Sequence, residues 1–293
     1  MSETAKGHLY IIIATILISG SFYASQILSG VIDSISLTLY RFVLAFIILF
    51  PLVISKKDGV KKAIKILPKA MIVSLFYSLY FIGMFQALEH TTILNTGTIY
   101  TLVPLMTAIL CIFFFKEKIP LKQLFVYIVG IVSTCIIIFQ ANIELFLKFS
   151  LNKGDIIFLI ASLSMALYPI FLKILYTKKD ELVITVTSTL LGGIIWMSLT
   201  MFILNIPYEW NKIEGDLLYS MLYLTIGTTV FTLFLYQKAS LILGPKKIMA
   251  YIYLSPALVA VIMYIFEKQS ISFGVMVGII ISTFATILIL RDK

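Results

Sequence analysis

Residues 86–120 read QALEHTTILNTGTIYTLVPLMTAILCIFFFKEKIP, and residues 238–272 read KASLILGPKKIMAYIYLSPALVAVIMYIFEKQSIS. The two stretches align at an offset of 152 positions, with a small gap near the end. Each is apolar overall but has a proline near its middle, where proline disrupts a helix. Any two apolar stretches align passably, but matched prolines and terminal glutamates favour a unit that occurs twice. The aligned pairs include Ala87 with Ala239, Pro104 with Pro256 and Glu117 with Glu267.

The composition indicates an integral membrane protein. The chain has 293 residues, of which 60% are hydrophobic and only 13% charged, and its mean hydropathy is +1.05. Soluble domains carry roughly a quarter charged residues, so this chain cannot cover a water-facing surface. The net charge of +9 does not require a nucleic-acid partner, because basic residues gather in the cytoplasmic loops of membrane proteins.

Apolar runs of the length needed to cross a bilayer, about 20 residues, recur along nearly the whole chain. The short connections between them require neighbouring spans to run antiparallel, and no loop could hold a soluble domain. We therefore expect an all-α integral membrane protein with ten transmembrane helices. The expected spans are 9–30, 36–54, 69–88, 92–115, 121–140, 155–176, 182–204, 216–240, 246–266 and 271–290.

The distribution of Lys and Arg sets the expected orientation. With the N-terminus in the cytoplasm, 18 of the 23 basic residues fall on the inner side and four on the outer side, and Arg41 lies within a span. This bias satisfies the positive-inside rule and predicts that both termini are cytoplasmic.

The repeat divides the ten spans into two sets of five, which we expect to lie in residues 1–145 and 146–293. Because five is odd, the two halves must insert with opposite topology. Inverted repeats are typical of secondary transporters, in which the halves rock about a site near the membrane midplane.

Three parts of the chain resemble the EamA-type branch of the drug/metabolite transporter superfamily. They are LTLYRFVLAFIILF (37–50), the block from Pro104 to Glu117 with its repeat, and GDIIFLIASLSMALYPIFLKIL (154–175). The resemblance implies two inverted five-helix halves around a central polar cavity, with alternating access. It also implies a solute among those that the family moves, mostly amino acids and related metabolites.

One region of the first span departs from the family pattern. Many members have Trp-Gly followed by Lys in this span, whereas here Ser19 takes the place of the Trp and Gln26 that of the Lys. Gln26 is thus a candidate substrate ligand that offers a neutral amide instead of a cation.

Polar side chains form stripes on several spans, since positions three and four apart share a helix face. Such stripes serve helix packing or line a cavity. The deep tyrosines favour a cavity, because their hydroxyls need partners inside a membrane. With Gln26, the candidate substrate-binding residues are Tyr77, Tyr80, Thr98, Thr101, Tyr168, Thr229, Thr232, Tyr236 and Tyr253.

A second set of residues is expected to bend, gate or stabilise the bundle. Pro104 and Pro256 should bend their helices. Arg41 lies inside the second span, where a charge is costly, and a structural or gating role is expected. It could snorkel outward, pair with a carboxylate such as Asp33 or Glu89, or reach the cavity rim. Glu117 and Glu267 close the fourth and ninth spans at opposite faces, as anchors or gate ion pairs.

The expected function is export of a small metabolite, an amino acid or derivative, across the inner membrane by alternating access. Multidrug or cation efflux, and uptake or exchange of a nucleotide-like metabolite, stay open. The sequence supplies no nucleophile with a base, metal cluster or carboxylate pair for an enzyme, and no cofactor is expected. The expected partners are a small solute and the lipid bilayer, without nucleic acid, for a monomer or homodimer.

Overall fold

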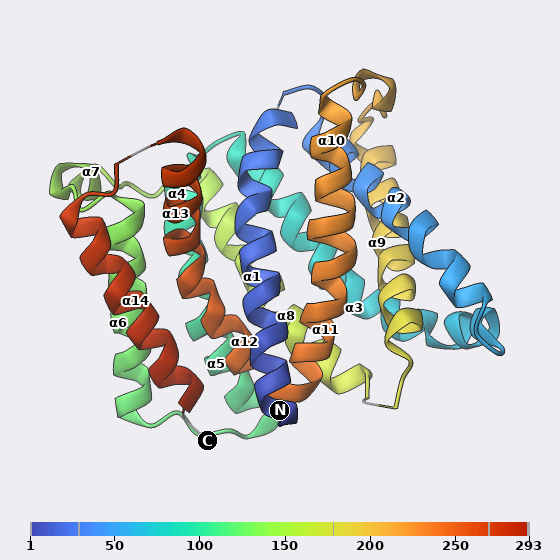
Figure 1. Cartoon of the computed structure of the whole chain (residues 1–293), viewed down its shortest axis with the longest axis horizontal. Coiled ribbons are helices and arrows are strands. Elements are labelled where there is room, and N and C mark those ends of the chain that lie inside the picture. The colour runs from blue at the N-terminus through green and yellow to red at the C-terminus, as the bar shows by residue number, and fades with distance from the viewer. Residues whose placement is uncertain (1, 29, 178, 269, 292–293) are drawn as a thin grey trace.

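The structure, a computed structural model, describes residues 2–28, 30–177, 179–268 and 270–291. Side chains at Phe22, Tyr23, Gln26, Ile93, Leu94 and Glu267 lie outside what it describes. The described residues are almost all helical and contain no strand (Figure 1). The all-α membrane fold predicted from the sequence is therefore confirmed.

The first half contains five long helical segments, and the fourth of them is divided into two helices, α4 and α5. A short helix then leads to the second half. These helices are α1 (Glu3–Leu28), α2 (Ser34–Ile54), α3 (Gly59–Leu88), α4 (Ile93–Tyr100), α5 (Val103–Phe115), α6 (Leu121–Ile138) and α7 (Ile143–Leu147).

The second half repeats this order. Its fourth segment is also divided, and so is its third segment, whose counterpart α3 is continuous. Its elements are α8 (Lys153–Leu175), α9 (Leu182–Leu204), η1 (Trp210–Lys212), α10 (Leu217–Leu222), η2 (Tyr223–Phe231), α11 (Thr232–Leu243), α12 (Pro245–Ala250), η3 (Tyr251–Leu254), α13 (Ser255–Glu267) and α14 (Phe273–Arg291).

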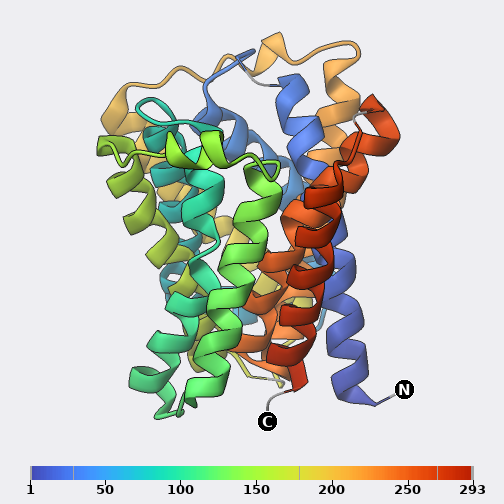
Figure 2. The same cartoon turned by 90° about the vertical axis from the view of Figure 1, so that its left-hand side faces the viewer.

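Within the described residues, nine helical segments are long and apolar enough to cross a membrane. The 26-residue α1 runs beside them and would complete the predicted ten. The two ends of the chain lie on the same side of the molecule (Figures 1 and 2), as an even number of antiparallel crossings requires. The count of ten and the cytoplasmic location of both ends stay predictions.

Both aligned prolines stand at a helix break. Pro104 occupies the first turn of α5, and the turn before it is tightened by bonds from Thr101 N to the Thr98 carbonyl and from Leu102 N to the Ile99 carbonyl. Pro256 likewise lies in the first turn of α13, after the 3₁₀ segment η3. Proline lacks the N–H that would continue the helix, so the same physical cause breaks the fourth and ninth bodies.

Two boundaries differ from the sequence-based expectation. The third span was predicted to begin at residue 69, but α3 begins ten residues earlier, at Gly59. This extension carries Lys61, Lys62 and Lys65, whose side chains are exposed. The eighth span contains a π-helical segment, η2, that the sequence did not predict.

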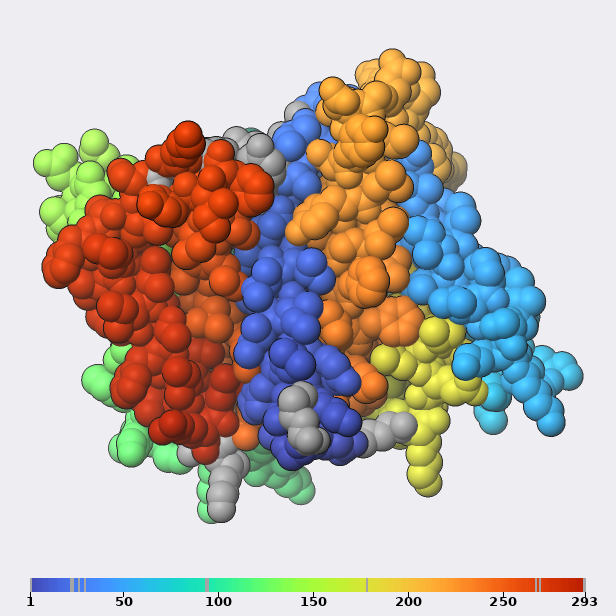
Figure 3. Space-filling view, viewed as in Figure 1, coloured from blue at the N-terminus to red at the C-terminus, as the bar shows by residue number. Residues whose placement is uncertain are grey.

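The helix contacts between the halves are reciprocal: a helix of one half packs on the same helices of the other half as its counterpart does in return. α3 packs on α8 and α9, and the corresponding segment of the second half, η2 with α11, packs on α1 and α2. α5 contacts α8, and its counterpart α13 contacts α1. Two helices pack directly on their own counterparts, α2 on α9 and α6 on α14. On the face in Figure 3, α1 of the first half lies between the α12–α14 region and α10–α11 of the second.

The close contact between α3 and α9 depends on a glycine. A Cβ added at Gly192 would lie 2.3 Å from Ser74 Oγ and 3.2 Å from the Ala70 carbonyl oxygen. We expect Gly192→Ala to force α3 and α9 apart and to lower the free energy of unfolding by about 1–3 kcal/mol. Gly97→Ala is the control, since its nearest neighbour is Ile138 Cδ1 at 3.8 Å. Thermal unfolding in detergent measures both; equal melting temperatures would contradict the close packing.

Candidate functional site

Aromatic side chains from both halves form a continuous cluster at the centre of the bundle. Tyr236 of α11 stacks on Tyr168 of α8, with ring centroids 5.5 Å apart. Tyr168 in turn lies 5.0 Å from Tyr77 of α3, which stacks on Phe42 of α2 at 5.8 Å. The structure therefore brings together three of the tyrosines named above as candidate ligands, and their role in binding stays a prediction.

The cluster continues along α3 towards the start of α4. Phe81 lies edge-on to both Tyr77 and Tyr80, with centroids 5.0 and 5.3 Å away. Tyr80 contacts the Tyr100 ring at 5.7 Å and is hydrogen-bonded to its hydroxyl. We call Phe42, Tyr77, Tyr80, Phe81, Tyr100, Phe158, Tyr168 and Tyr236 the aromatic cluster.

Part of the aromatic cluster keeps solvent-accessible surface. Phe42 and Tyr168 are 1% exposed, but Tyr77, Tyr80 and Tyr100 are only half-buried, although each lies well inside its helical body among packed neighbours. Apolar ring faces with a few hydroxyl groups suit an amphipathic solute.

The only charged residue of α2, Arg41, adjoins the cluster. Its Nη2 donates to the hydroxyl oxygens of Thr228 and Thr229, each at 3.2 Å. Both threonine hydroxyls donate to the Leu224 carbonyl, at 2.8 and 2.9 Å. The wider π-helical turn lets two consecutive threonines reach one carbonyl, and π-bulges are frequent at functional sites.

The other predicted ligands make contacts of their own. Thr101 is 2% exposed and bonds to the Thr98 carbonyl, with Cys135 of α6 beside it. Tyr253 is also fully buried and packs its ring on Gly130 of α6. Thr98 lies half-buried on α4, and the Thr232 hydroxyl is bonded within its own helix to the Thr228 carbonyl. The side chain of Gln26 lies outside the described residues.

The sequence reasoning did not single out Phe42, Phe158 or Thr228. Phe42 follows Arg41 directly, so its position in the span was a usable signal. Phe158 is one apolar residue among many on α8, and no sequence signal distinguished it. Thr228 was hidden because the expected spacing of 3.6 residues per turn points it away from Thr229, and only the π-helix brings both to Arg41.

We call the end of the bundle away from both chain termini the outer end, and the end beside them the inner end, after the predicted orientation. The outer end is joined by a buried polar network that links the two halves. Asp155 of α8 is 1% exposed and accepts hydrogen bonds from the Thr91 hydroxyl, the Asn95 amide at 2.9 Å and the Asn152 backbone N–H at 2.8 Å. Asn152 completes a capping box on α8 and also donates to Thr91 at 3.1 Å. The network fixes the start of α4 against the start of α8.

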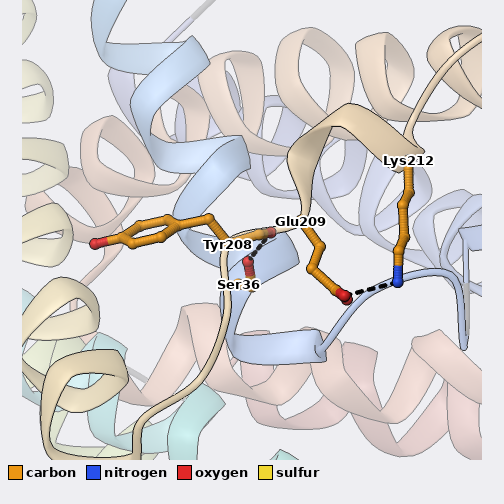
Figure 4. A network of polar contacts seen from close by, with 4 residues as sticks. All are labelled: Ser36, Tyr208, Glu209 and Lys212. Atoms are coloured by element: carbon orange, nitrogen blue, oxygen red, sulfur yellow. Dashed lines mark hydrogen bonds and ion pairs between the residues drawn. The ribbon is translucent and has the colours of Figure 1, made fainter.

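A second group of outer contacts fixes the loop between α9 and α10 on the start of α2. The Ser36 hydroxyl donates to the Tyr208 carbonyl at 2.6 Å and accepts from Trp210 Nε1 at 3.0 Å. Figure 4 shows this contact and the neighbouring ion pair of Lys212 with Glu209, 2.7 Å long, while the Tyr208 ring points away from both. The exposed Tyr208 ring is consistent with an interfacial anchor.

The inner end is joined by ion pairs and a histidine contact. Glu117, after α5, pairs with Lys246 of α12 at 2.8 Å, and both side chains are partly buried. Lys62 of α3 pairs with Glu181 at the start of α9. His8 of α1 is 2.9 Å from the Tyr251 hydroxyl. Each of these contacts joins one half to the other. Glu117 thus forms an ion pair between the halves, as a gate residue would. The Glu267 side chain lies outside the described residues.

The inner contact at His8 predicts a dependence of stability on pH. Burial lowers the pKa of His8, and nearby Lys247 lowers it further. A depressed histidine pKa means that folding favours the neutral ring, so its contribution is complete above about pH 6.5 and is lost as pH falls through the folded-state pKa. We expect the melting temperature to fall between pH 7 and 5 by less in His8→Gln than in the wild type. Equal slopes would contradict this.

A shallow hollow of about 90 Å³ lies apart from the aromatic cluster, between α2, the start of α3 and α9. Its lining is apolar, with Phe46, Phe50 and Leu67, and only Thr187 and Ser188 add hydroxyls. A lateral groove for a lipid headgroup would need a polar lining, which this hollow does not offer.

Comparisons with known proteins agree with this architecture. A protein of Bacillus subtilis (strain 168) named uncharacterized transporter YyaM is 23% identical over 223 residues, which cover 76% of this chain and 72% of that protein. A protein of known crystal structure superposes with a TM-score of 0.75 over 99% of this chain and 98% of its own, at 14% identity, which shows the fold alone. The EamA-like transporter family matches residues 5–139 and again residues 152–291. The chain therefore belongs to the EamA-like transporter family and is a multi-pass membrane transporter of the drug/metabolite superfamily.

Proposed function

We propose that the protein is a secondary transporter that exports a small metabolite, an amino acid or derivative, across the inner membrane by alternating access. The observation that carries the proposal is the aromatic cluster with Arg41, which is built from both halves and in which Tyr77, Tyr80 and Tyr100 are only half-buried. A solute bound there touches helices of both halves, so movement of the halves can expose it to either side.

The contacts at the two ends supply the gates for such a cycle. The Asp155 network joins the halves at the outer end, and Glu117–Lys246 with His8–Tyr251 joins them at the inner end. Alternating access requires that one set opens while the other stays closed. In this structure both sets are made, as in an occluded state. The division of the chain at residues 145 and 146 and the monomeric or dimeric state belong to this proposal.

The test is thermal stabilisation of the purified protein by amino acids, nucleosides, S-adenosylmethionine and quaternary cations. A ligand at one hundred times its dissociation constant should stabilise the fold by about 2.7 kcal/mol. We expect an amino acid or derivative to raise the melting temperature of the wild type but to act more weakly on Tyr77→Phe. Thr101→Val is the control, because Thr101 faces α6. A panel without any shift would contradict the proposal.

Cation efflux is the alternative that the aromatic cluster itself favours, since ring faces attract cations. Against it stands Arg41, whose fixed positive charge beside Tyr77 repels a cationic solute. Stabilisation by quaternary cations alone would move the assignment to drug efflux.

A further inference from the structure

The positive charge of Arg41 has no acidic partner among the residues that the structure describes. The ion pairs formed by these residues do not include Arg41. Asp33, one candidate partner, is exposed and caps α2 by accepting from the backbone N–H groups of Ile35 and Ser36. Among the residues that the structure describes, only two neutral hydroxyls therefore hold the guanidinium inside its membrane-spanning helix.

The hydrogen-bonding capacity of this guanidinium is largely unused. It has five N–H donors. In the described part of the chain only Nη2 donates, to Thr228 and Thr229, and Nε is buried without a partner. A buried charge that is neither paired nor fully hydrogen-bonded is costly, and charges within transmembrane segments mark substrate pathways.

The surroundings of Arg41 define what could satisfy it. Arg41 and the Tyr77 hydroxyl interact electrostatically, and Tyr77 keeps accessible surface within the aromatic cluster. Phe42, the next residue along α2, stacks on the same tyrosine. An anion at the guanidinium would thus have ring faces beside it for an apolar body. The corresponding helix of the other half, α9, contains no Lys or Arg, so Arg41 is the single cation of the α2–α9 pair.

We propose that Arg41 binds the carboxylate of the transported solute and thereby selects amphipathic monocarboxylates, an inference that rests on the proposed transport function. The charged guanidinium can give a carboxylate charge-assisted hydrogen bonds, which are stronger than neutral ones. A single cation balances the charge of a carboxylate, whereas a phosphate dianion would keep excess charge in a low-dielectric site. Thr228 and Thr229 hold the guanidinium in place through Nη2, and Nη1, which makes no hydrogen bond with the described residues, is left for the ligand.

The test compares affinities for N-acetyl-L-phenylalanine, its neutral amide and phenyl phosphate, measured by binding to the purified full-length protein. For the wild type we expect the carboxylate to bind about tenfold or more tightly than the amide, the size of a charge-assisted hydrogen-bond loss. In Arg41→Gln the ratio should fall to about one. The ratio is independent of the amount of folded protein. Thr101→Val should keep the wild-type ratio.

The remaining outcomes separate the two proposals. An unchanged ratio in Arg41→Gln overturns the role of Arg41 while transport stands. If that variant does not fold, Arg41→Lys, which keeps the charge but lacks the guanidinium donors, must lower the ratio several-fold, and an unchanged ratio overturns the role. Tighter binding of phenyl phosphate than of the carboxylate overturns the monocarboxylate assignment. Failure of all three probes overturns it as well, and the broader ligand panel then decides whether transport itself fails.

Discussion

Asp155→Ala is expected to lower the free energy of unfolding by about 3 kcal/mol or more. The buried carboxylate accepts three hydrogen bonds, from Thr91, Asn95 and the Asn152 backbone, and its removal leaves these donors unsatisfied. Hydrogen bonds to a charged group contribute about 1.5–3 kcal/mol each, and an orphaned buried donor adds its desolvation cost. Thermal unfolding in detergent should show a loss on the order of 10 °C.

The control for this prediction is Asp180→Ala. Asp180 also accepts hydrogen bonds from a neighbouring backbone N–H and hydroxyl, both from Thr177, but it does so in an exposed loop. Water can replace those contacts, so we expect a change below about 1 kcal/mol. If the two variants lost the same stability, the outer network would not hold the halves together.

Lys246→Glu is expected to open the inner end of the bundle. The substitution places two carboxylates where Glu117 and Lys246 now meet at 2.8 Å, and juxtaposed like charges cost several kcal/mol. The native Cys111 reports the change, because its thiol is buried and accepts a hydrogen bond from the Lys246 backbone. In a Cys135→Ala background, labelling of Cys111 by a maleimide should become at least about tenfold faster.

Restoring the pair with opposite polarity is the control. The double variant Glu117→Lys/Lys246→Glu keeps one charge of each sign at the same two positions, so Cys111 should return to slow labelling. Fast labelling in the double variant, or slow labelling in Lys246→Glu, would show that the ion pair does not keep the inner end closed.

The helices and their breaks were predictable because they depend on local chemistry. Apolar runs of bilayer length give the spans, and Pro104 and Pro256 break their helices through the missing N–H. The third helix began earlier than predicted because hydropathy detects only the part within the lipid. The basic turn after Gly59 stays helical outside it.

The candidate site was predictable only in part, because sequence gives the face of a helix but not its neighbour. Tyr77, Tyr168 and Tyr236 do meet. Tyr253 belongs to an equally polar stripe, yet it packs on Gly130 of α6, a pairing that depends on the tertiary arrangement. The approach of Thr228 to Arg41 depends on a π-helical turn, which no local pattern in this sequence predicts.

The most direct test of the central claim is two-sided labelling of a cysteine at Tyr77. In a chain with Cys111→Ala and Cys135→Ala, Tyr77→Cys is treated with a membrane-impermeant thiol reagent from the outside and, in inverted vesicles, from the inside. Tyr253→Cys serves as the buried control. We predict that position 77 is labelled from both sides of the membrane and position 253 from neither side. Labelling of position 77 from one side only, or not at all, would contradict alternating access through the aromatic cluster.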